Sequence, residues 1–284
     1  MIYIPILGAL ALAGGTIITK VVLREKKVNI KLFQTAAFFA AVLVMIPLLY
    51  FFWTFQPQAL ESKNLGIFFL IILFSMIANL AMFYSMKREK VSELEPAFVL
   101  EPLFTILLAI LFSFLVSVEL YERNLKVIIP ALIAGGVLIL THIKKDHIKF
   151  NKYFLVAVVG SFFFALELVL SRLILDFYSP MTFYFLRCSS LFILSFIIFK
   201  PKFEKLNSKI RWEILAIGAL WVAFRVIVYY GYLQLGVIFT TLVLMIGPIF
   251  VFLFAWKFLK EKLGWKNILA TIVIVGCVLY AMIG

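Results

Sequence analysis

Ten apolar stretches follow one another along the chain, and their length constrains the fold more than any motif does. They cover residues 2–22, 31–55, 65–86, 92–116, 124–141, 152–175, 181–199, 212–234, 237–257 and 265–283. A helix needs about 20 apolar residues to cross the hydrocarbon core of a bilayer. Of the 284 residues, 65% are hydrophobic and 14% are charged, too few polar residues to cover a soluble protein of this size. The sequence therefore predicts an all-α integral membrane protein with ten transmembrane helices in a lipid bilayer.

The Lys and Arg residues gather in alternate loops between these stretches. Most of the 27 lie near residues 24–31, 87–90, 144–152, 200–211 and 257–266, whereas the opposite loops hold Lys63, Arg123, Lys126 and Arg172. Basic residues stay on the cytoplasmic side of a membrane. We therefore expect a cell-membrane protein with both termini outside. The net charge of +13 follows from this topology and does not indicate a nucleic-acid partner.

The chain also resembles one five-helix unit written twice. Residues 78–104 align without gaps to residues 224–250, and this alignment places Tyr84 on Tyr230 and Pro102 on Pro248. Equivalent loops exchange their basic content, as REKKVN does against DFYSPM. The pattern predicts two inverted five-helix repeats, residues 1–143 and 152–284, joined by a cytoplasmic linker at residues 144–151. Inverted repeats are typical of transporters that work by alternating access.

Two segments of the second half resemble a known family. GSFFFALELVLSRLILDFYSPMTFYFLR ends with an arginine early in a helix, Arg187. The segment from YYGYLQLG to GCVLY has a tyrosine-rich helix end, a central proline (Pro248) and a later glutamate (Glu261). These patterns resemble the drug/metabolite transporter superfamily, and within it the EamA-type ten-helix carriers. The first half follows them less closely. The resemblance implies a secondary carrier for small organic solutes, often exported, without ATP hydrolysis of its own.

Polar residues in the middle of apolar stretches are the first candidates for a binding site, because a charge in the bilayer is costly. Arg225 lies in the middle of residues 212–234, and its repeat partner Asn79 lies at the equivalent depth. We expect both to bind substrate in a central chamber; the alternative for Arg225 is a structural ion pair with Glu167. Glu167 is interpreted either as a proton-coupling carboxylate or as the counter-ion of Arg225 or Arg187.

Four further residues complete the predicted substrate site. Arg187 either faces the chamber or extends to the outer interface. The aligned pair Tyr84 and Tyr230 is expected to line the substrate path, with interfacial anchoring as the alternative. Glu101 directly precedes a proline and is deep enough to face the cavity.

The two aligned prolines interrupt their helices, because proline has no backbone N–H to donate. Pro102 and Pro248 are therefore interpreted as hinges, with kinks that do not move as the alternative. The sequence contains no Walker A, HExxH or GxSxG motif and no metal-ligand spacing. We predict no catalytic residue, no metal and no cofactor; an integral-membrane enzyme or a sensor is a distant alternative.

The charges suggest a class of substrate. Two arginines in an aromatic chamber favour a small amino-acid-like, anionic or zwitterionic solute, exported or passively conducted. If Glu167 neutralises the arginines, a cationic or neutral amphipathic drug exchanged for protons becomes the alternative. The sequence is compatible with a monomer or a homodimer.

Overall fold

The computed structural model describes residues 3–89, 91–116, 120–121, 124–142, 151–247, 250 and 265–283. Within these residues the protein is all-α, as predicted, and has no strand apart from one isolated bridge between Phe55 and Tyr178. The helices are α1 (Tyr3–Arg24), α2 (Ile30–Phe52), α3 (Ser62–Arg88), α4 (Val91–Phe98), α5 (Leu100–Leu115), α6 (Leu125–His142), α7 (Lys152–Arg172), α8 (Pro180–Phe199), α9 (Ser208–Gln234), α10 (Val237–Leu244) and α12 (Trp265–Ile283). Short 3-10 turns lie at Pro57–Leu60, Leu175–Phe177 and Phe203–Lys205.

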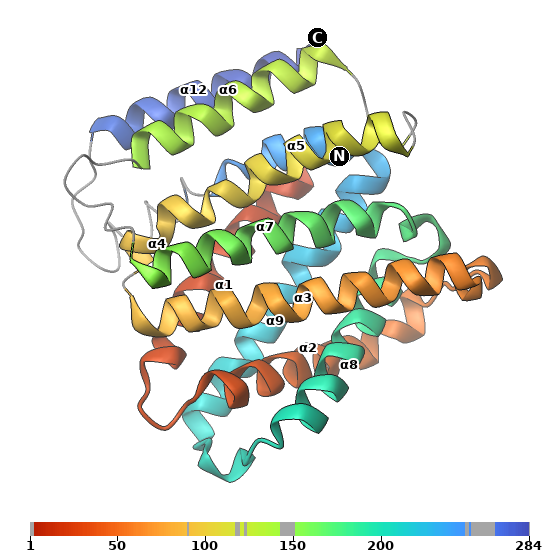
Figure 1. Ribbon diagram of the computed structural model, residues 1–284, viewed down its shortest axis with the longest axis vertical. Helices are drawn as coiled ribbons and strands as arrows, with labels where there is room; N and C mark the ends of the chain where they lie inside the picture. Colours follow the sequence, from red (N-terminus) through yellow and green to blue (C-terminus); the bar gives the residue numbers. More distant parts are fainter. Residues whose placement is uncertain are drawn as a thin grey trace.

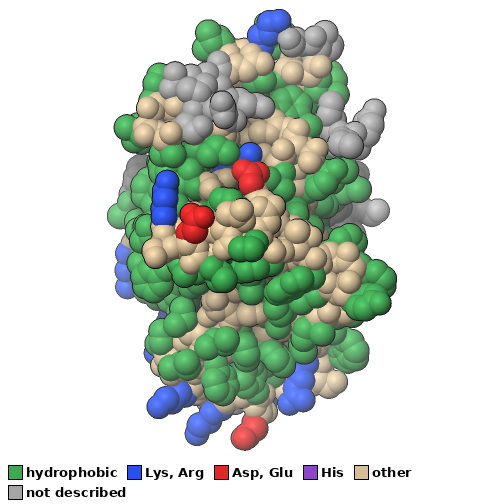
Figure 2. Space-filling model, turned by 90° about the vertical axis from the view of Figure 1, so that its right-hand side faces the viewer, with side chains coloured by type: hydrophobic (Ala, Val, Ile, Leu, Met, Phe, Trp, Pro, Cys, Tyr) green, Lys and Arg blue, Asp and Glu red, His purple; other side chains and the backbone are tan. Residues whose placement is uncertain are grey.

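Six of the described helices are long and apolar enough to cross a membrane: α1, α2, α3, α7, α8 and α9. Shorter apolar helices lie at Leu100–Leu115, Leu125–Val137 and Ile272–Met282. Apolar side chains cover much of the face seen in Figure 2, and the exposed ones include Leu7, Phe51 and Phe69. Large exposed apolar areas are unusual for a soluble monomer and are expected where lipid is the solvent. The total of ten spans stays a prediction.

Side-chain caps fix where several helices begin. The Asn29 side chain accepts a hydrogen bond from the backbone N–H of Leu32 at 2.7 Å at the start of α2. Asn151, Ser179 and Asn207 cap α7, α8 and α9 in the same way. Each cap satisfies an N–H group that has no partner inside its helix. Because these caps fix the residue at which each helix begins, the loops that precede the helices stay short.

The helices pack in pairs that combine the two halves of the chain. In Figure 1, α6 and α12 lie together at one end of the molecule and α2 and α8 at the other. Between them α3 packs along α7, and α1 packs along α9. Both described chain ends lie toward the right-hand side of Figure 1, where α3 begins. The centre of the molecule is therefore enclosed by helices from both halves.

Two glycines allow close approach of these central helices. A Cβ atom at Gly218 of α9 would lie 2.8 Å from the backbone nitrogen of Ala41 in α2. A Cβ atom at Gly160 of α7 would lie 3.3 Å from the carbonyl oxygen of Ala78 in α3. Small residues permit such backbone contacts between helices in membranes, where packing drives association.

Candidate functional site

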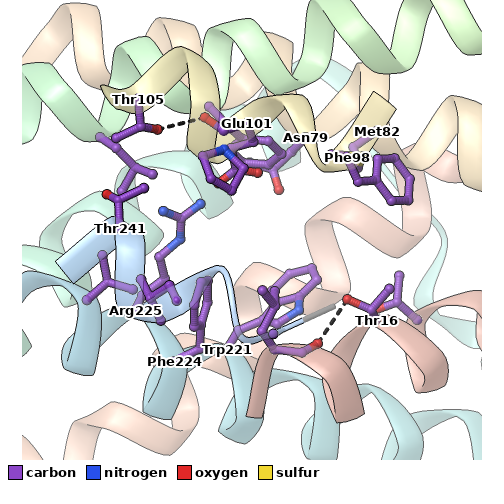
Figure 3. Close-up of a pocket in the computed structure, with 18 of the residues that line it drawn as sticks. Thr16, Asn79, Met82, Phe98, Glu101, Thr105, Trp221, Phe224, Arg225 and Thr241 are labelled. Carbon is purple, nitrogen blue, oxygen red and sulfur yellow. Dashed lines mark hydrogen bonds between the residues drawn. The ribbon is translucent and has the colours of Figure 1, made fainter. Parts of the chain in front are cut away.

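A cavity of about 200 Å³ lies between the central helices (Figure 3). Residues of α1, α2, α3, α4, α5, α7, α8, α9 and α10 line it, so both halves of the chain contribute. Its wall is mostly apolar and aromatic, and a few polar side chains reach it. A concave apolar site with a small number of placed polar groups is the usual form of a small-molecule site.

Glu167 in the middle of α7 organises the charges behind this cavity. Its side chain is fully buried, with 0% exposure. Its Oε2 accepts a hydrogen bond from Arg187 Nη2 at 3.0 Å, and its Oε1 accepts one from Tyr229 Oη at 3.1 Å. Ser171, one turn later, donates to the Glu167 backbone carbonyl at 2.7 Å and to Oε1 at 3.3 Å. The carboxylate is thus held by partners from three helices, as a buried charge requires.

Arg187 is the main counter-ion of Glu167. It donates from Nε to Ser75 Oγ at 2.9 Å and from Nη1 to Tyr229 Oη at 3.1 Å, in addition to the ion pair. The side chain is 2% exposed, and its guanidinium lies over the ring of Tyr184. Arg187 therefore does not extend to the outer interface, which was one of its two predicted positions. Its guanidinium donates to partners inside the protein.

Arg225 of α9 is held much more loosely. Its Nη2 lies 3.9 Å from Glu167 Oε2, beyond hydrogen-bond distance. Its Nη1 is buried and has no hydrogen-bond partner in the described structure. The guanidinium packs between Phe164 and Phe224, 5.4 and 5.5 Å from the ring centroids, in cation–π contacts. A buried donor without an acceptor is costly, and Figure 3 shows the Arg225 guanidinium directed into the cavity.

Acceptor groups lie on the cavity wall that faces Arg225 (Figure 3). Asn79 lines the cavity from α3, and its Nδ2 donates back to the Ser75 carbonyl at 2.7 Å. Glu101 lines it from the first turn of α5 and is half-buried. Among the described residues, no cationic side chain lies within 4.0 Å of the Glu101 carboxylate. The structure thus brings together Arg225, Asn79 and Glu101 around one space.

Both aligned segments contain a helix interruption. Helix α4 ends at Phe98, four residues before Pro102, and α5 begins after Val99. In the second half α10 ends at Leu244, again four residues before the proline of the aligned segment. Proline cannot donate to the carbonyl four residues earlier, which explains the break before Pro102. The predicted stretch 92–116 is therefore two helices. Pro248 and the predicted linker residues 144–150 lie outside the described residues.

The tyrosines are arranged differently from the repeat-based expectation. Neither Tyr84 nor Tyr230 is among the described residues that line the cavity. Tyr84 packs on Tyr153, with ring centroids 5.5 Å apart. The fully buried Tyr229, one residue earlier on α9, instead bonds to both Glu167 and Arg187. No sequence signal separated it from its neighbour.

Two serines that the sequence analysis did not single out support the charged cluster. Ser75 and Ser171 each lie four residues from a candidate residue, Asn79 and Glu167, and so share a helix face with it. Both serines could have been predicted from this spacing. The described residues contain no group of three or more His, Cys, Asp or Glu side chains placed to hold a metal ion.

Comparison with known proteins identifies the family. No curated protein matches the chain. One solved crystal structure superposes with a TM-score of 0.70 at 17% sequence identity, over 99% of this chain and 96% of that one, which shows a shared fold. The model of the EamA-like transporter family matches residues 1–122 and 151–283. This chain therefore belongs to the EamA-like transporter family, a family of multi-pass membrane transporters within the drug/metabolite transporter superfamily.

Proposed function

We propose that the protein is a secondary transporter that moves a small organic solute with an anionic group by alternating access. The observation that carries this proposal is the unpartnered Nη1 of Arg225 at the central cavity. Arg187 binds Glu167 at 3.0 Å, whereas Arg225 reaches the same carboxylate only at 3.9 Å, so its guanidinium keeps donors for a ligand. A planar guanidinium is well suited to bind a carboxylate through two parallel hydrogen bonds.

Matching features of the two halves support the predicted inverted repeat and, with it, the proposed transport mechanism. The alignment that places Tyr84 on Tyr230 also places Ser62 on Ser208, and the helices that begin there, α3 and α9, both have 27 residues. The contact pairs α3 with α7 and α1 with α9 correspond to each other when the two halves are exchanged. The family model matches residues 1–122 and 151–283, on either side of the predicted linker. Two such units can exchange conformations around a shared central site.

The cavity favours a metabolite over a drug as the solute. Its volume of about 200 Å³ is below the roughly 300–1,000 Å³ of sites for drug-sized ligands. An amino-acid-like or other small anionic or zwitterionic solute fits the charge of Arg225. The direction we propose is export or facilitated passage across the cell membrane. The competing function is proton-coupled export of a cationic amphipathic drug, which requires the arginines to be fully neutralised.

A binding screen tests the proposal. Purified protein is heated with amino acids, organic acids and lipophilic cations, and the unfolding temperature is recorded for wild type and Arg225→Ala. A carboxylate ligand should stabilise the wild type and leave folded Arg225→Ala unaffected. Arg172→Ala is the matched control: among the described residues Arg172 forms its ion pair with the half-exposed Asp176 at 2.7 Å, and it is not among those that line the cavity.

Flux measurements complete the test. Proteoliposomes that contain the wild type should take up the stabilising solute, and those with Arg225→Ala should not. Uptake of a lipophilic cation in exchange for protons, with no movement of any carboxylate, would replace the proposal by the competing function.

A further inference from the structure

We infer that Glu101 is a specificity-determining residue and that the transported solute is a zwitterion, with its cationic group at Glu101 and its anionic group at Arg225. The inference rests on the proposed function and narrows it to solutes that carry both charges. It starts from which charges of the cluster are already satisfied. Glu167 and Arg187 form a closed pair at 3.0 Å with further hydrogen bonds to Tyr229 and Ser75.

The two remaining charges face each other across the cavity rather than pairing. Arg225 and Glu101 both line it, yet among the ion pairs of the described residues none within 4.0 Å joins them; the one of Arg225 is with Glu167, at 3.9 Å. Figure 3 shows the Arg225 guanidinium pointing from α9 into the space below Glu101. Two opposite charges on low-dielectric walls attract each other strongly. A bound solute with both charges would satisfy each of them without closing the cavity.

Hydrogen-bond donors lie on the Arg225 side of the cavity, and acceptors lie on the Glu101 side. Arg225 can only donate, and an ionised Glu101 can only accept. Asn79 donates one of its two amide N–H groups to the Ser75 carbonyl, and its side-chain oxygen is a second acceptor near Glu101. A carboxylate only accepts and an ammonium group only donates. The donor side of the cavity therefore fits the carboxylate of an amino acid, and the acceptor side fits its ammonium group.

A simple organic anion would meet a penalty in this site. Its carboxylate would bind Arg225, but nothing on it would donate to Glu101, whose charge would be covered without a partner. A site rejects a ligand that leaves one of its buried polar groups unpaired more strongly than a ligand that lacks an apolar contact. The same argument excludes a simple amine, which would leave Arg225 unsatisfied. Only a solute with both groups satisfies both walls.

The test compares analogues that differ by one charged group. Leucine, phenylalanine and threonine are each measured beside the deaminated acid and the decarboxylated amine, by calorimetric binding to purified wild type. At least one amino acid should bind about tenfold or more tightly than its deaminated acid. In Glu101→Gln that preference should disappear, because amino-acid affinity falls while acid affinity holds or rises. Adding Asn79→Asp to Glu101→Gln should restore it.

Two outcomes would contradict the inference or the proposed function. If an acid binds wild type as tightly as its amino acid, Glu101 does not read a cationic group and the inference is overturned, whereas the proposed anion transport stands. If no carboxylate in any series binds wild type, the proposed function itself fails. Glu61→Gln, the same change at an exposed residue that does not line the cavity, is the control and should keep the preference. If Glu101→Gln does not fold, two measurements still test the inference. Wild type should prefer the amino acid to its deaminated acid, and Glu101→Asp should keep that preference.

Discussion

Arg187 uses all three of its nitrogen atoms, and each contacts a different partner: Ser75, Tyr229 and Glu167. A lysine carries the same charge but presents its donors from one point, so it cannot reach three partners in these directions. We expect Arg187→Lys to lower the free energy of unfolding by about 1–3 kcal/mol, because at least one buried group loses its partner. Thermal denaturation in detergent measures this change.

The control for that substitution is Arg172→Lys. Arg172 pairs with Asp176 one turn later, and the Asp176 side chain is 50% exposed. Pairs of this kind contribute about 0–1 kcal/mol, so the unfolding temperature should hardly move. Equal losses for the two substitutions would mean that the network around Arg187 does not stabilise the fold beyond its charge.

Tyr229 connects the two charged residues through one hydroxyl group. That hydroxyl donates to Glu167 and accepts from Arg187, each at 3.1 Å. Tyr229→Phe should therefore cost about 1–3 kcal/mol of stability, since both buried partners lose a hydrogen bond. Tyr50→Phe, at a residue that is 88% exposed, is the comparison and should be close to neutral. A neutral Tyr229→Phe would show that the remaining bonds hold Glu167 equally well.

The sequence located part of this cluster, and the reason for its limit is geometric. Arg225, Asn79 and Glu167 stood out because each is polar in the middle of an apolar helix, where burial in protein or at a cavity is the only favourable position. Tyr230 was preferred to its neighbour Tyr229, because successive residues of a helix point about 100° apart and an apolar helix has no polar face to set its rotation. Which arginine pairs with Glu167 depends on how three helices pack.

At the scale of the helices, the contact between α2 and α9 depends on one missing side chain. A Cβ atom at Gly218 would lie 2.8 Å from Ala41 N and 2.9 Å from Ala40 C, both backbone atoms that cannot turn aside. We expect Gly218→Ala to push the two helices apart and to cost about 1–3 kcal/mol of stability. Thermal denaturation and crosslinking of cysteines placed across the contact would report the change.

Gly66 in α3 is the matched control for this substitution. A Cβ atom there would meet nothing within 4 Å. Alanine is also the better helix former, so Gly66→Ala should be neutral or stabilising by up to about 1 kcal/mol. A loss of stability at both glycines would indicate that adding a methyl group to these helices, and not the contact of α2 with α9, explains the result.

The helix ends show what the sequence determines well and what it does not. The starts of α2, α7, α8 and α9 follow from Asn and Ser residues that cap them, a local effect that any packing preserves. The interruption near Val99 follows from Pro102, but the sequence alone could not say that the residues after it would turn Glu101 toward the cavity. That outcome depends on how α5 packs on α7 and α10.

For the whole molecule, the prediction to test is the inverted orientation of the two halves. The loop after α1 and the loop after α7 are equivalent in the repeat, and Figure 1 shows them on opposite sides of the molecule. The first contains Lys26 and Lys27, whereas the second contains Asp176. Basic residues stay on the cytoplasmic side, so we expect residues 25–29 inside the cell and residues 173–179 outside.

Single cysteines measure this arrangement directly. Cys188 is buried and is kept, whereas Cys277 is replaced by alanine. Single cysteines are then introduced at the exposed positions Lys26, Gln58 and Asp176. A membrane-impermeant maleimide added to intact cells should label Gln58→Cys and Asp176→Cys, and Lys26→Cys only after the membrane is opened. Labelling of Lys26→Cys and Asp176→Cys from the same side would make the halves parallel. The cavity would then lack the two-fold relation that lets two inverted units expose one central site first to one side of the membrane and then to the other.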